Sequence, residues 1–249
     1  MNTLLPVLHV MGMMLIFFGA TYLMPIASSL IYADGTTGEF LDALLACLAC
    51  GAGLVFLTRN FKRELRPRDG FLLVTLAWVL MAAIATVPLM LTIDNLSFTD
   101  AFFETMSGLT TTGATVLTGL ENLPPSINLW RHELNWLGGM GIIVLAVAIL
   151  PLLGVGGMQL YKAENAWPDE GLQADAAHCR DCKGALADYF GITAACIGAL
   201  KLAGMNWLDA ICHAFAALSL GVFSTYDASV GHFDSPLIEG ILIFFMMVA

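Results

Sequence analysis

Residues 98–114 read FTDAFFETMSGLTTTGA, a short apolar segment followed by a run of threonines and a glycine. A transmembrane helix needs roughly 20 mostly apolar residues, so the apolar part, residues 98–110, is too short to cross a membrane. Its length predicts a re-entrant half-helix over residues 101 to about 109, capped by Thr99 or Asp100. Backbone that leaves a helix at membrane depth is tolerated only where it lines water or protein. We therefore expect the segment after this half-helix to face a water-filled path or the protein interior.

Thr110, Thr111, Thr112 and Gly113 are suited to binding a bare cation. Threonine is a poor helix former with a small polar side chain, and glycine permits a left-handed turn. Such a turn can point successive backbone carbonyls toward one axis, where they replace the water shell of a cation. The C-terminal end of the half-helix carries a partial charge of roughly −0.5 and favours a cation at the same place. The alternative is an ordinary helix end that is rich in threonine and closed by a glycine C-cap.

A weaker copy of this pattern lies 109 positions further along the chain. The shift aligns Asp100-Ala101 with Asp209-Ala210, within a second short apolar piece, residues 207–219. The weaker candidate cation ligands in this copy are Ser219, Leu220, Gly221 and Val222. A period near 110 residues is too long for a solenoid and suits the internal repeats of channels and transporters.

The composition of the whole chain excludes a soluble protein. Of its 249 residues, 58% are apolar and only 12% are charged, and the mean hydropathy is +0.80. A water-soluble domain of this size could not bury so much apolar surface. A net charge of −10 repels phosphate, so nucleic-acid binding is disfavoured as well.

Five stretches are long and apolar enough to span a bilayer, namely residues 4–31, 40–58, 71–93, 129–155 and 185–204. A last apolar piece, residues 237–249, reaches about 20 Å into a hydrocarbon core of ~30 Å, so we expect a fragment that stops inside a helix. The predicted fold class is an all-α polytopic membrane protein. It consists of repeated span–pore-loop–span units with re-entrant half-helices, the last unit being incomplete.

Basic residues predict the direction of the spans. Arg59, Lys62, Arg63, Arg66 and Arg68 lie between the second and third spans, and Lys162, Arg180 and Lys183 between the fourth and fifth. An even number of spans separates these two loops, so both can be cytoplasmic, and the N-terminus is then cytoplasmic too. The loops 32–39, 94–128 and 205–236 would face outward.

Polar residues at the outer ends of the predicted spans leave alternatives open. Arg131, with His132 and Glu133, is either a charge that guards a pore entrance or, as we favour, a snorkelling residue with a local ion pair. Lys201 can snorkel toward Asp209 or act in transport. Asp227, His232 and Asp234 either raise the local cation concentration or form an ordinary solvated loop. We expect Gly138, Gly139 and Gly141 to allow close helix packing.

The cysteines do not indicate a disulfide framework. Cys47, Cys50, Cys196 and Cys212 lie in apolar stretches, where a thiol is usually a small core residue. Cys179 and Cys182 follow His178 and form half of a possible zinc site whose second ligand pair is missing. No nucleophile–base pair is evident, and we expect neither an enzyme nor a cofactor.

Three long motifs resemble the TrkH family of bacterial potassium-uptake proteins, within the Trk, Ktr and HKT superfamily. They are FETMSGLTTTGATV (residues 103–116), WRHELNWLGGMGIIVLAVAILPLLGVGGMQLYKAE (130–164) and DAICHAF followed by GVFSTYDASVGHFDSP (209–236). The resemblance implies four span–pore-loop–span repeats preceded by two extra helices. Residues 1–69 would hold the extra helices and a basic loop, residues 70–184 the first repeat with a cytoplasmic linker, and residues 185–249 an incomplete second repeat.

The resemblance also implies a function. The chain would belong to the pore-forming subunit that translocates potassium across the bacterial inner membrane. Its partners would be membrane lipid, a second copy of itself in a homodimer, and a cytosolic nucleotide-binding ring, TrkA. Potassium would be the transported substrate, and its ligands would be the carbonyls of Thr110 to Gly113, with Ser219 to Val222 as a second set.

Three departures from the family pattern bear on this function. Repeats three and four are absent, and the loop 167–188 lacks the expected basic, helix-forming character. Val222 stands where the family usually has glycine, so either that turn is distorted or Gly221 absorbs it. A non-conducting membrane remnant or scaffold is therefore one alternative. An intramembrane enzyme that uses His132 and Glu133, or His178 with the CxxC, is another.

Overall fold

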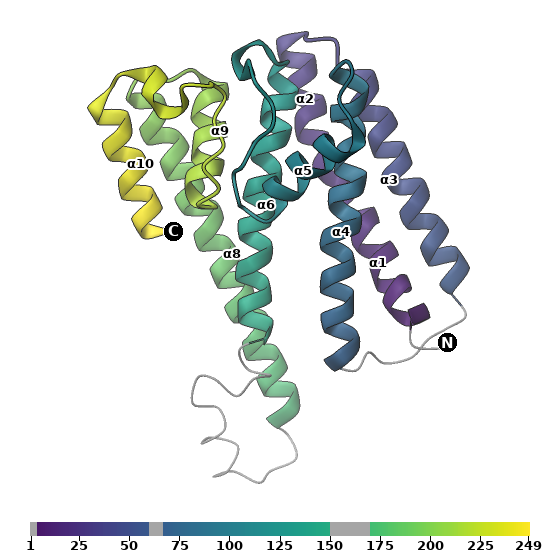
Figure 1. Cartoon of the computed structure of the whole chain (residues 1–249). Coiled ribbons are helices and arrows are strands. Elements are labelled where there is room, and N and C mark those ends of the chain that lie inside the picture. Colours follow the sequence, from purple (N-terminus) through teal and green to yellow (C-terminus); the bar gives the residue numbers. More distant parts are fainter. Residues whose placement is uncertain (1–3, 60–66, 150–169) are drawn as a thin grey trace.

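The structure, a computed structural model, describes residues 4–59, 67–149 and 170–249, and the side chains of residues 4–59, 69–142 and 184–249. In these residues the chain forms helices joined by loops, without a strand (Figure 1). The helices are α1 (Leu4–Gly19), α2 (Leu23–Tyr32), α3 (Thr37–Thr58), α4 (Pro67–Thr92), α5 (Phe98–Leu109), α6 (Pro125–Ile149), α8 (Glu170–Leu202), α9 (Trp207–Leu218) and α10 (Pro236–Val248).

Among the described residues, four helical stretches are long and apolar enough to cross a membrane. They are Leu4–Tyr32, Thr37–Thr58, Asp69–Thr92 and Gly184–Leu202, which confirms four of the five predicted spans. The fifth corresponds to α6, which begins at Pro125 rather than near residue 129. With 25 residues it is about 37 Å long, enough to span a bilayer, but its first half carries buried polar side chains.

The first span agrees with the predicted residues 4–31 but is interrupted rather than one continuous α-helix. A short 3₁₀ turn, Ala20–Tyr22, separates α1 from α2. Pro25 lies four residues after Thr21, and a proline ring clashes with the carbonyl four positions before it. The tighter turn accommodates this clash, and the Thr21 hydroxyl donates a hydrogen bond to the Phe18 carbonyl at 2.7 Å.

Helix α6 stands between two groups of helices (Figure 1). Helices α1 to α5 pack on one side of it around Tyr22, Phe40 and Trp130, and the Tyr22 and Trp130 rings stack with centroids 4.5 Å apart. Helices α8, α9 and α10 pack on the other side around Trp136 and Phe215, whose rings stack at 4.8 Å. The single helix α6 therefore contributes to both cores.

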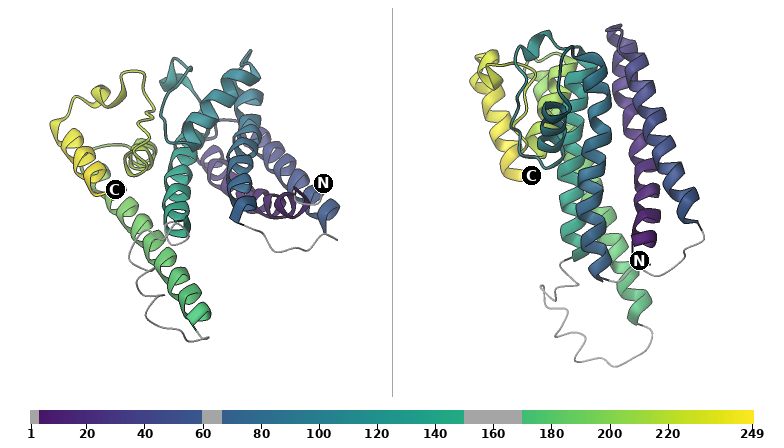
Figure 2. Two further views of the ribbon diagram at one scale, coloured as in Figure 1. Left: turned by 60° about the horizontal axis from the view of Figure 1, so that its bottom comes forward. Right: turned by 45° about the vertical axis from the view of Figure 1, so that its right-hand side comes forward.

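The connections lie at two opposite ends of the molecule (Figures 1 and 2). The ends of α3 and α6 and the starts of α1, α4 and α8 lie together at one end, and the turns 33–36, 93–97 and 203–206 lie at the other, which we call the loop end. Helices α5 and α9 both start at the loop end and stop part-way through the molecule. This arrangement brings the borders of the two basic loops to the same end, as the predicted topology requires.

Asp34 ties the turn between α2 and α3 to the start of α6. Its carboxylate accepts hydrogen bonds from the Ser29 hydroxyl at 2.6 Å, the Thr36 amide at 3.1 Å and the Ser126 amide at 3.0 Å. Burial alone would raise the pKa of Asp34, but these hydrogen bonds outweigh it and lower the pKa to about 2. The carboxylate is therefore charged at neutral pH, and the accessory helices are fixed to α6 at the loop end.

Candidate functional site

The two short helices α5 and α9 are structural copies of one another. Each has 12 residues, and both ends of α9 lie 109 positions after those of α5. Their N-caps also match, because the side chains of Ser97 and Asn206 accept hydrogen bonds from the amides of Asp100 at 3.1 Å and Asp209 at 2.7 Å. The first helix therefore starts three residues earlier than we predicted, and the cap is Ser97 rather than Thr99 or Asp100. The signal was present in the sequence as Ser-x-x-Asp and Asn-x-x-Asp, the spacing of a capping box.

The segments that follow the two helices also repeat. We call residues 110–116 the first loop segment and residues 219–225 the second loop segment. In the first, the amides of Thr111 and Thr112 donate to the carbonyls of Gly108 and Ser107, both at 2.9 Å. In the second, the amides of Leu220 and Gly221 donate to the carbonyls of Ala217 at 3.2 Å and Ala216 at 2.9 Å. Both helices thus end in the same Schellman-type arrangement, with a non-glycine residue at its left-handed position.

Left-handed backbone recurs at alternate residues in both loop segments. The φ angles are 56° at Thr111 and 71° at Gly113, and 54° at Leu220 and 60° at Val222. Gly113 lies two residues beyond the left-handed position that closes α5. It is therefore not the C-cap glycine that the ordinary-helix-end alternative supposed.

Val222 adopts the left-handed conformation itself. We had expected either a distorted turn or a turn absorbed by Gly221, and both alternatives are wrong, because Gly221 has no positive φ and the turn matches that at Gly113. A left-handed conformation costs a β-branched residue about 1–3 kcal/mol. The side chain of Val222 is 63% exposed, so no neighbour crowds it in addition.

The two loop segments lie against each other at Gly113. A Cβ atom at this position would overlap the carbonyl oxygen of Gly221 and would stand 3.3 Å from the Cβ of Val222. Glycine at 113 is thus favoured by the left-handed φ and required by the close approach of the second segment.

Adjacent glycines of α6 receive the ends of the two short helices. A Cβ at Gly138 would overlap the carbonyl group of Leu109, and a Cβ at Gly139 would lie 3.0 Å from the Cα of Ser219. Gly141 has looser surroundings, with Trp78 at 3.7 Å from a Cβ built there. The predicted close packing is confirmed for Gly138 and Gly139, each of which makes room for one half-helix C-terminus, but not for Gly141.

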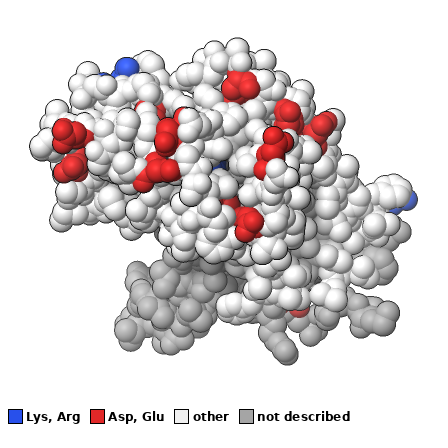
Figure 3. Space-filling view, turned by 45° about the horizontal axis from the view of Figure 1, so that its top comes forward, with Lys and Arg blue, Asp and Glu red and all other residues white. Residues whose placement is uncertain are grey.

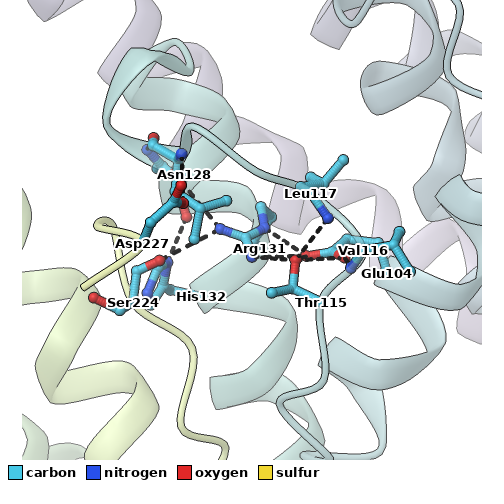
Figure 4. Close-up of polar contacts among 10 residues, drawn as sticks. Glu104, Thr115, Val116, Leu117, Asn128, Arg131, His132, Ser224 and Asp227 are labelled. Atoms are coloured by element: carbon cyan, nitrogen blue, oxygen red, sulfur yellow. Dashed lines mark hydrogen bonds and ion pairs between the residues drawn. The ribbon is translucent and has the colours of Figure 1, made fainter. Parts of the chain in front are cut away.

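We had favoured an Arg131 that snorkels to the interface, and this interpretation is wrong. Its side chain is 1% exposed and lies between α5, α6 and the two loop segments (Figure 4). Its ion-pair partner is Glu104 of α5, with Nη2 and Oε1 2.7 Å apart, rather than the neighbouring Glu133. The sequence could not show this partner, which is 27 positions away on another helix.

The neighbouring His132 and Glu133 point into the protein. Their exposed fractions are 0% and 4%, and His132 Nδ1 lies 2.6 Å from the Asn128 carbonyl. No hydrogen bond joins the two side chains in the described part of the chain, and both are buried. His178, Cys179 and Cys182 lie outside the residues whose side chains are described. Elsewhere among the described residues, no three His, Cys, Asp or Glu side chains group to hold a metal ion.

Lys201 lies at the loop end of α8, but Asp209 is not its partner. Its ammonium group donates to the Met205 carbonyl at 3.1 Å and lies 5.2 Å from the Trp207 ring centre. Asp209 instead accepts hydrogen bonds from the hydroxyls of Thr225 at 2.7 Å and Tyr226 at 3.0 Å. Burial and this bond to Asp209 raise the pKa of Tyr226 to about 12.

Asp227 joins the loops that follow the two segments. Its carboxylate accepts hydrogen bonds from the amides of Gly119 at 2.7 Å and Leu120 at 3.0 Å, and these bonds lower its pKa. Beside it, Tyr226 and His232 stack with ring centroids 3.6 Å apart. Acidic side chains gather over this face of the molecule (Figure 3). Those exposed in the loops and nearby helix ends are Asp94, Asp100, Glu121, Asp227, Asp234 and Glu239.

The fold is that of a helical membrane protein with two repeated short-helix units, and comparison with known proteins gives the family. A family model described as "TrkH: Cation transport protein" matches residues 37–249, so the chain belongs to the TrkH family. It is 44% identical over 244 residues to the Trk system potassium uptake protein TrkH of Vibrio parahaemolyticus, and 46% identical over 242 residues to TrkH of Escherichia coli K12. These matches cover 98% and 97% of this chain and 50% of each relative.

A solved structure agrees with the sequence comparison. The crystal structure of the potassium transporter TrkH from Vibrio parahaemolyticus aligns with a TM-score of 0.85 at 41% identity, over 98% of this chain and 49% of that one. The predicted resemblance and the all-helical membrane fold are therefore confirmed. The chain spans about half the length of the curated relatives that it matches.

Proposed function

We propose that this chain forms part of the potassium-conducting path of a Trk-type uptake system, as a portion of its pore-forming subunit. The observation that carries the proposal is the pair of left-handed residues in each loop segment, 111 with 113 and 220 with 222. In an extended chain successive carbonyls alternate in direction. A left-handed residue at every second position reverses this alternation and brings neighbouring carbonyls to one side. Carbonyls arranged in this way can replace the water shell of a potassium ion.

The electrostatics of the site support a cation rather than an anion. Both half-helices direct their C-termini, with a partial charge of roughly −0.5 each, toward the loop segments. In this proposal the carbonyls of Thr110, Thr111, Thr112 and Gly113 bind the ion from one side, and those of Ser219, Leu220, Gly221 and Val222 bind it from another. The exposed acidic side chains at the loop end raise the cation concentration near the entrance.

The resemblance and the basic loops support the finer assignments. We place the chain in the bacterial inner membrane, with the N-terminus and the two basic loops in the cytoplasm. Residues 1–69 supply two accessory helices, residues 70–184 the first repeat, and residues 185–249 the second. The family resemblance supports a homodimer and a TrkA-like nucleotide-binding ring as partners, with no cofactor and no enzymatic reaction.

A non-conducting scaffold is the second candidate. It is favoured by Val222, which holds a strained left-handed conformation where glycine would hold it without cost. The described residues supply two loop segments, which is half of what a four-fold filter needs.

Substitution of Gly113 tests the proposal. The measurement is potassium uptake by a full-length chimera, in which this chain replaces the half of Escherichia coli TrkH that it matches, in cells that lack other potassium uptake systems. The unsubstituted chimera should take up potassium. Gly113→Ser should reduce uptake or its selectivity over sodium, because the new side chain would displace the Gly221 carbonyl.

The matched control is Gly35→Ser. Gly35 also has a positive φ, 82°, but has open space where a Cβ would lie and is in the turn between α2 and α3. It carries a similar backbone cost far from the loop segments, so uptake should be retained. Equal behaviour of the two variants, or a chimera that takes up no potassium, would argue for the scaffold.

A further inference from the structure

The buried pair formed by Arg131 and Glu104 contacts both loop segments. We infer that these two residues position the filter, and that the second loop segment depends for its placement on Arg131, a residue of the first repeat. The inference rests on the proposed function, because it assigns a role in ion selection to residues that cannot touch the ion.

The carboxylate of Glu104 accepts hydrogen bonds from the first loop segment. The Thr115 hydroxyl lies 2.9 Å from both carboxylate oxygens, and the Val116 amide donates to Oε2 at 3.2 Å. Arg131 completes these contacts, because Nε donates to Glu104 Oε1 at 2.8 Å and Nη2 to the Thr115 hydroxyl at 3.2 Å. Glu104 is 1% exposed, so these bonds are sheltered from water (Figure 4).

The same guanidinium reaches the second loop segment. Nη1 donates to the Ser224 carbonyl at 3.4 Å, and the guanidinium carbon lies 4.6 Å from the ring centre of Phe223. The first contact fixes a backbone carbonyl two residues after Val222, and the second is a cation–π contact with the residue between them. Arg131 therefore holds the two segments in a fixed relation (Figure 4).

The described residues of the second repeat hold no such pair of their own. The residue 109 positions after Glu104 is His213, whose Nε2 lies 3.1 Å from the Ser224 hydroxyl. This contact copies the bond between Glu104 and Thr115, since Ser224 corresponds to Thr115. The corresponding place in α10 holds Gly240, Ile241 and Leu242, none of which carries a charge. In the described residues the contact between helix and loop segment is therefore repeated, whereas the arginine is present in the first repeat only.

The geometry requires an arginine rather than any cation. The guanidinium offers five donors in a planar fork, and here it faces a carboxylate, a hydroxyl, a carbonyl and an aromatic ring at once. A lysine ammonium can pair with Glu104 but cannot keep all four contacts. Arg131→Lys thus preserves the buried charge balance and removes the connection between the segments.

The test measures potassium and sodium uptake by the full-length chimera described above. Arg131→Lys should accumulate in the membrane and lower the ratio of potassium to sodium uptake by roughly tenfold, the factor expected from losing one charge-assisted hydrogen bond. The matched control is Lys201→Arg, an exchange between the same two residue types at the loop end of α8, which should leave the ratio unchanged. A ratio for Arg131→Lys equal to that of the parent would overturn the inference.

Two further variants keep the outcomes distinct. If Arg131→Lys does not accumulate, the double variant Glu104→Met with Arg131→Met decides, because removal of both charges spares the fold the cost of an unpaired charge. It should accumulate and transport without selectivity, and full selectivity would overturn the inference. Gly113→Ser in the same assay separates the two proposals. A change in uptake or in the uptake ratio for Gly113→Ser, without a change for Arg131→Lys, refutes only the positioning role. Unchanged uptake and an unchanged ratio for Gly113→Ser refute the proposed filter.

Discussion

Val222 has a backbone conformation that its side chain disfavours. Its φ of 60° is close to the 71° of Gly113, the residue that corresponds to it in the first repeat. The hydrogen bonds that close α9 are donated by the amides of Ser219, Leu220 and Gly221, and they match those donated after α5 by Thr110, Thr111 and Thr112. Val222 follows these residues directly and bears the steric cost of its left-handed conformation.

We expect Val222→Gly to stabilise the protein. Glycine adopts a left-handed conformation at no steric cost, a gain that exceeds the entropy lost in ordering glycine, so the free energy of unfolding should rise by about 0.5–1 kcal/mol. The measurement is the unfolding midpoint in detergent. Val116→Gly is the matched control, since Val116 is 47% exposed and has no positive φ. Val116→Gly should destabilise the protein. An equal loss of stability for the two variants would contradict the strain at Val222.

Single residues show where sequence reasoning is sufficient and where it is not. Gly113 could be predicted, because glycine beside threonines at a half-helix end indicates a special turn. Arg131 was misjudged, because its partner Glu104 is fixed by helix packing and not by sequence proximity. The left-handed φ of Val222 could not be predicted, because the steric preference of a β-branched residue argues against it.

At the scale of the elements, α6 supports both half-helices with neighbouring residues. Gly138 faces the last carbonyl of α5, and Gly139 faces the residue that follows α9. Adjacent residues of a helix point in directions about 100° apart, so one glycine pair can serve two helices that approach from different sides. The position of each loop segment relative to the other thus depends on α6.

We expect Gly138→Ala to destabilise the protein strongly and Gly141→Ala to have little effect. The added methyl at 138 would overlap the Leu109 carbonyl group, which is backbone and cannot rotate away, at a cost of about 1–3 kcal/mol or more. At 141 the nearest atoms, in the Trp78 ring, stand at an ordinary 3.7 Å. Unfolding midpoints in detergent compare the two variants. Similar unfolding midpoints would show that the packing of α5 against α6 does not depend on glycine at 138.

The helices themselves were largely predictable, and their ends less so. The short apolar segments predicted at 98–110 and 207–219 are observed as helices Phe98–Leu109 and Trp207–Leu218, because their polar boundaries are sharp, although the first half-helix was expected to start only at 101. The early start of α6 at Pro125 was missed, because Arg131, His132 and Glu133 read as an interface although all three are buried. Apolarity marks what faces lipid, whereas a polar cluster inside a membrane protein has no comparable signature.

At the scale of the whole molecule, the helix ends predict which loops share a compartment. Cysteines introduced singly at residues 63 and 162 should be protected from a membrane-impermeant thiol reagent in intact cells. Cysteines at 122 and 234 should be labelled. The basis is the excess of lysine and arginine in the two inner loops and the placement of the intervening helices (Figure 1). A control after permeabilisation should label all four positions. Labelling of residue 63 in intact cells would reverse the proposed orientation.

The number of loop segments predicts what this chain can do without further repeats. A selective filter of this kind needs four segments around one axis, and the described residues supply two. Two copies of the chain could supply four, but each copy would bring Val222 and its left-handed strain of about 1–3 kcal/mol. We therefore expect the 249-residue chain, expressed alone, to insert in the membrane without supporting growth at low potassium. Val222→Gly should not restore growth, whereas fusion to the other half of a full-length relative should. Immunodetection in isolated membranes separates failure to insert from failure to conduct, and growth supported by the unextended chain would instead establish a pore formed by two copies.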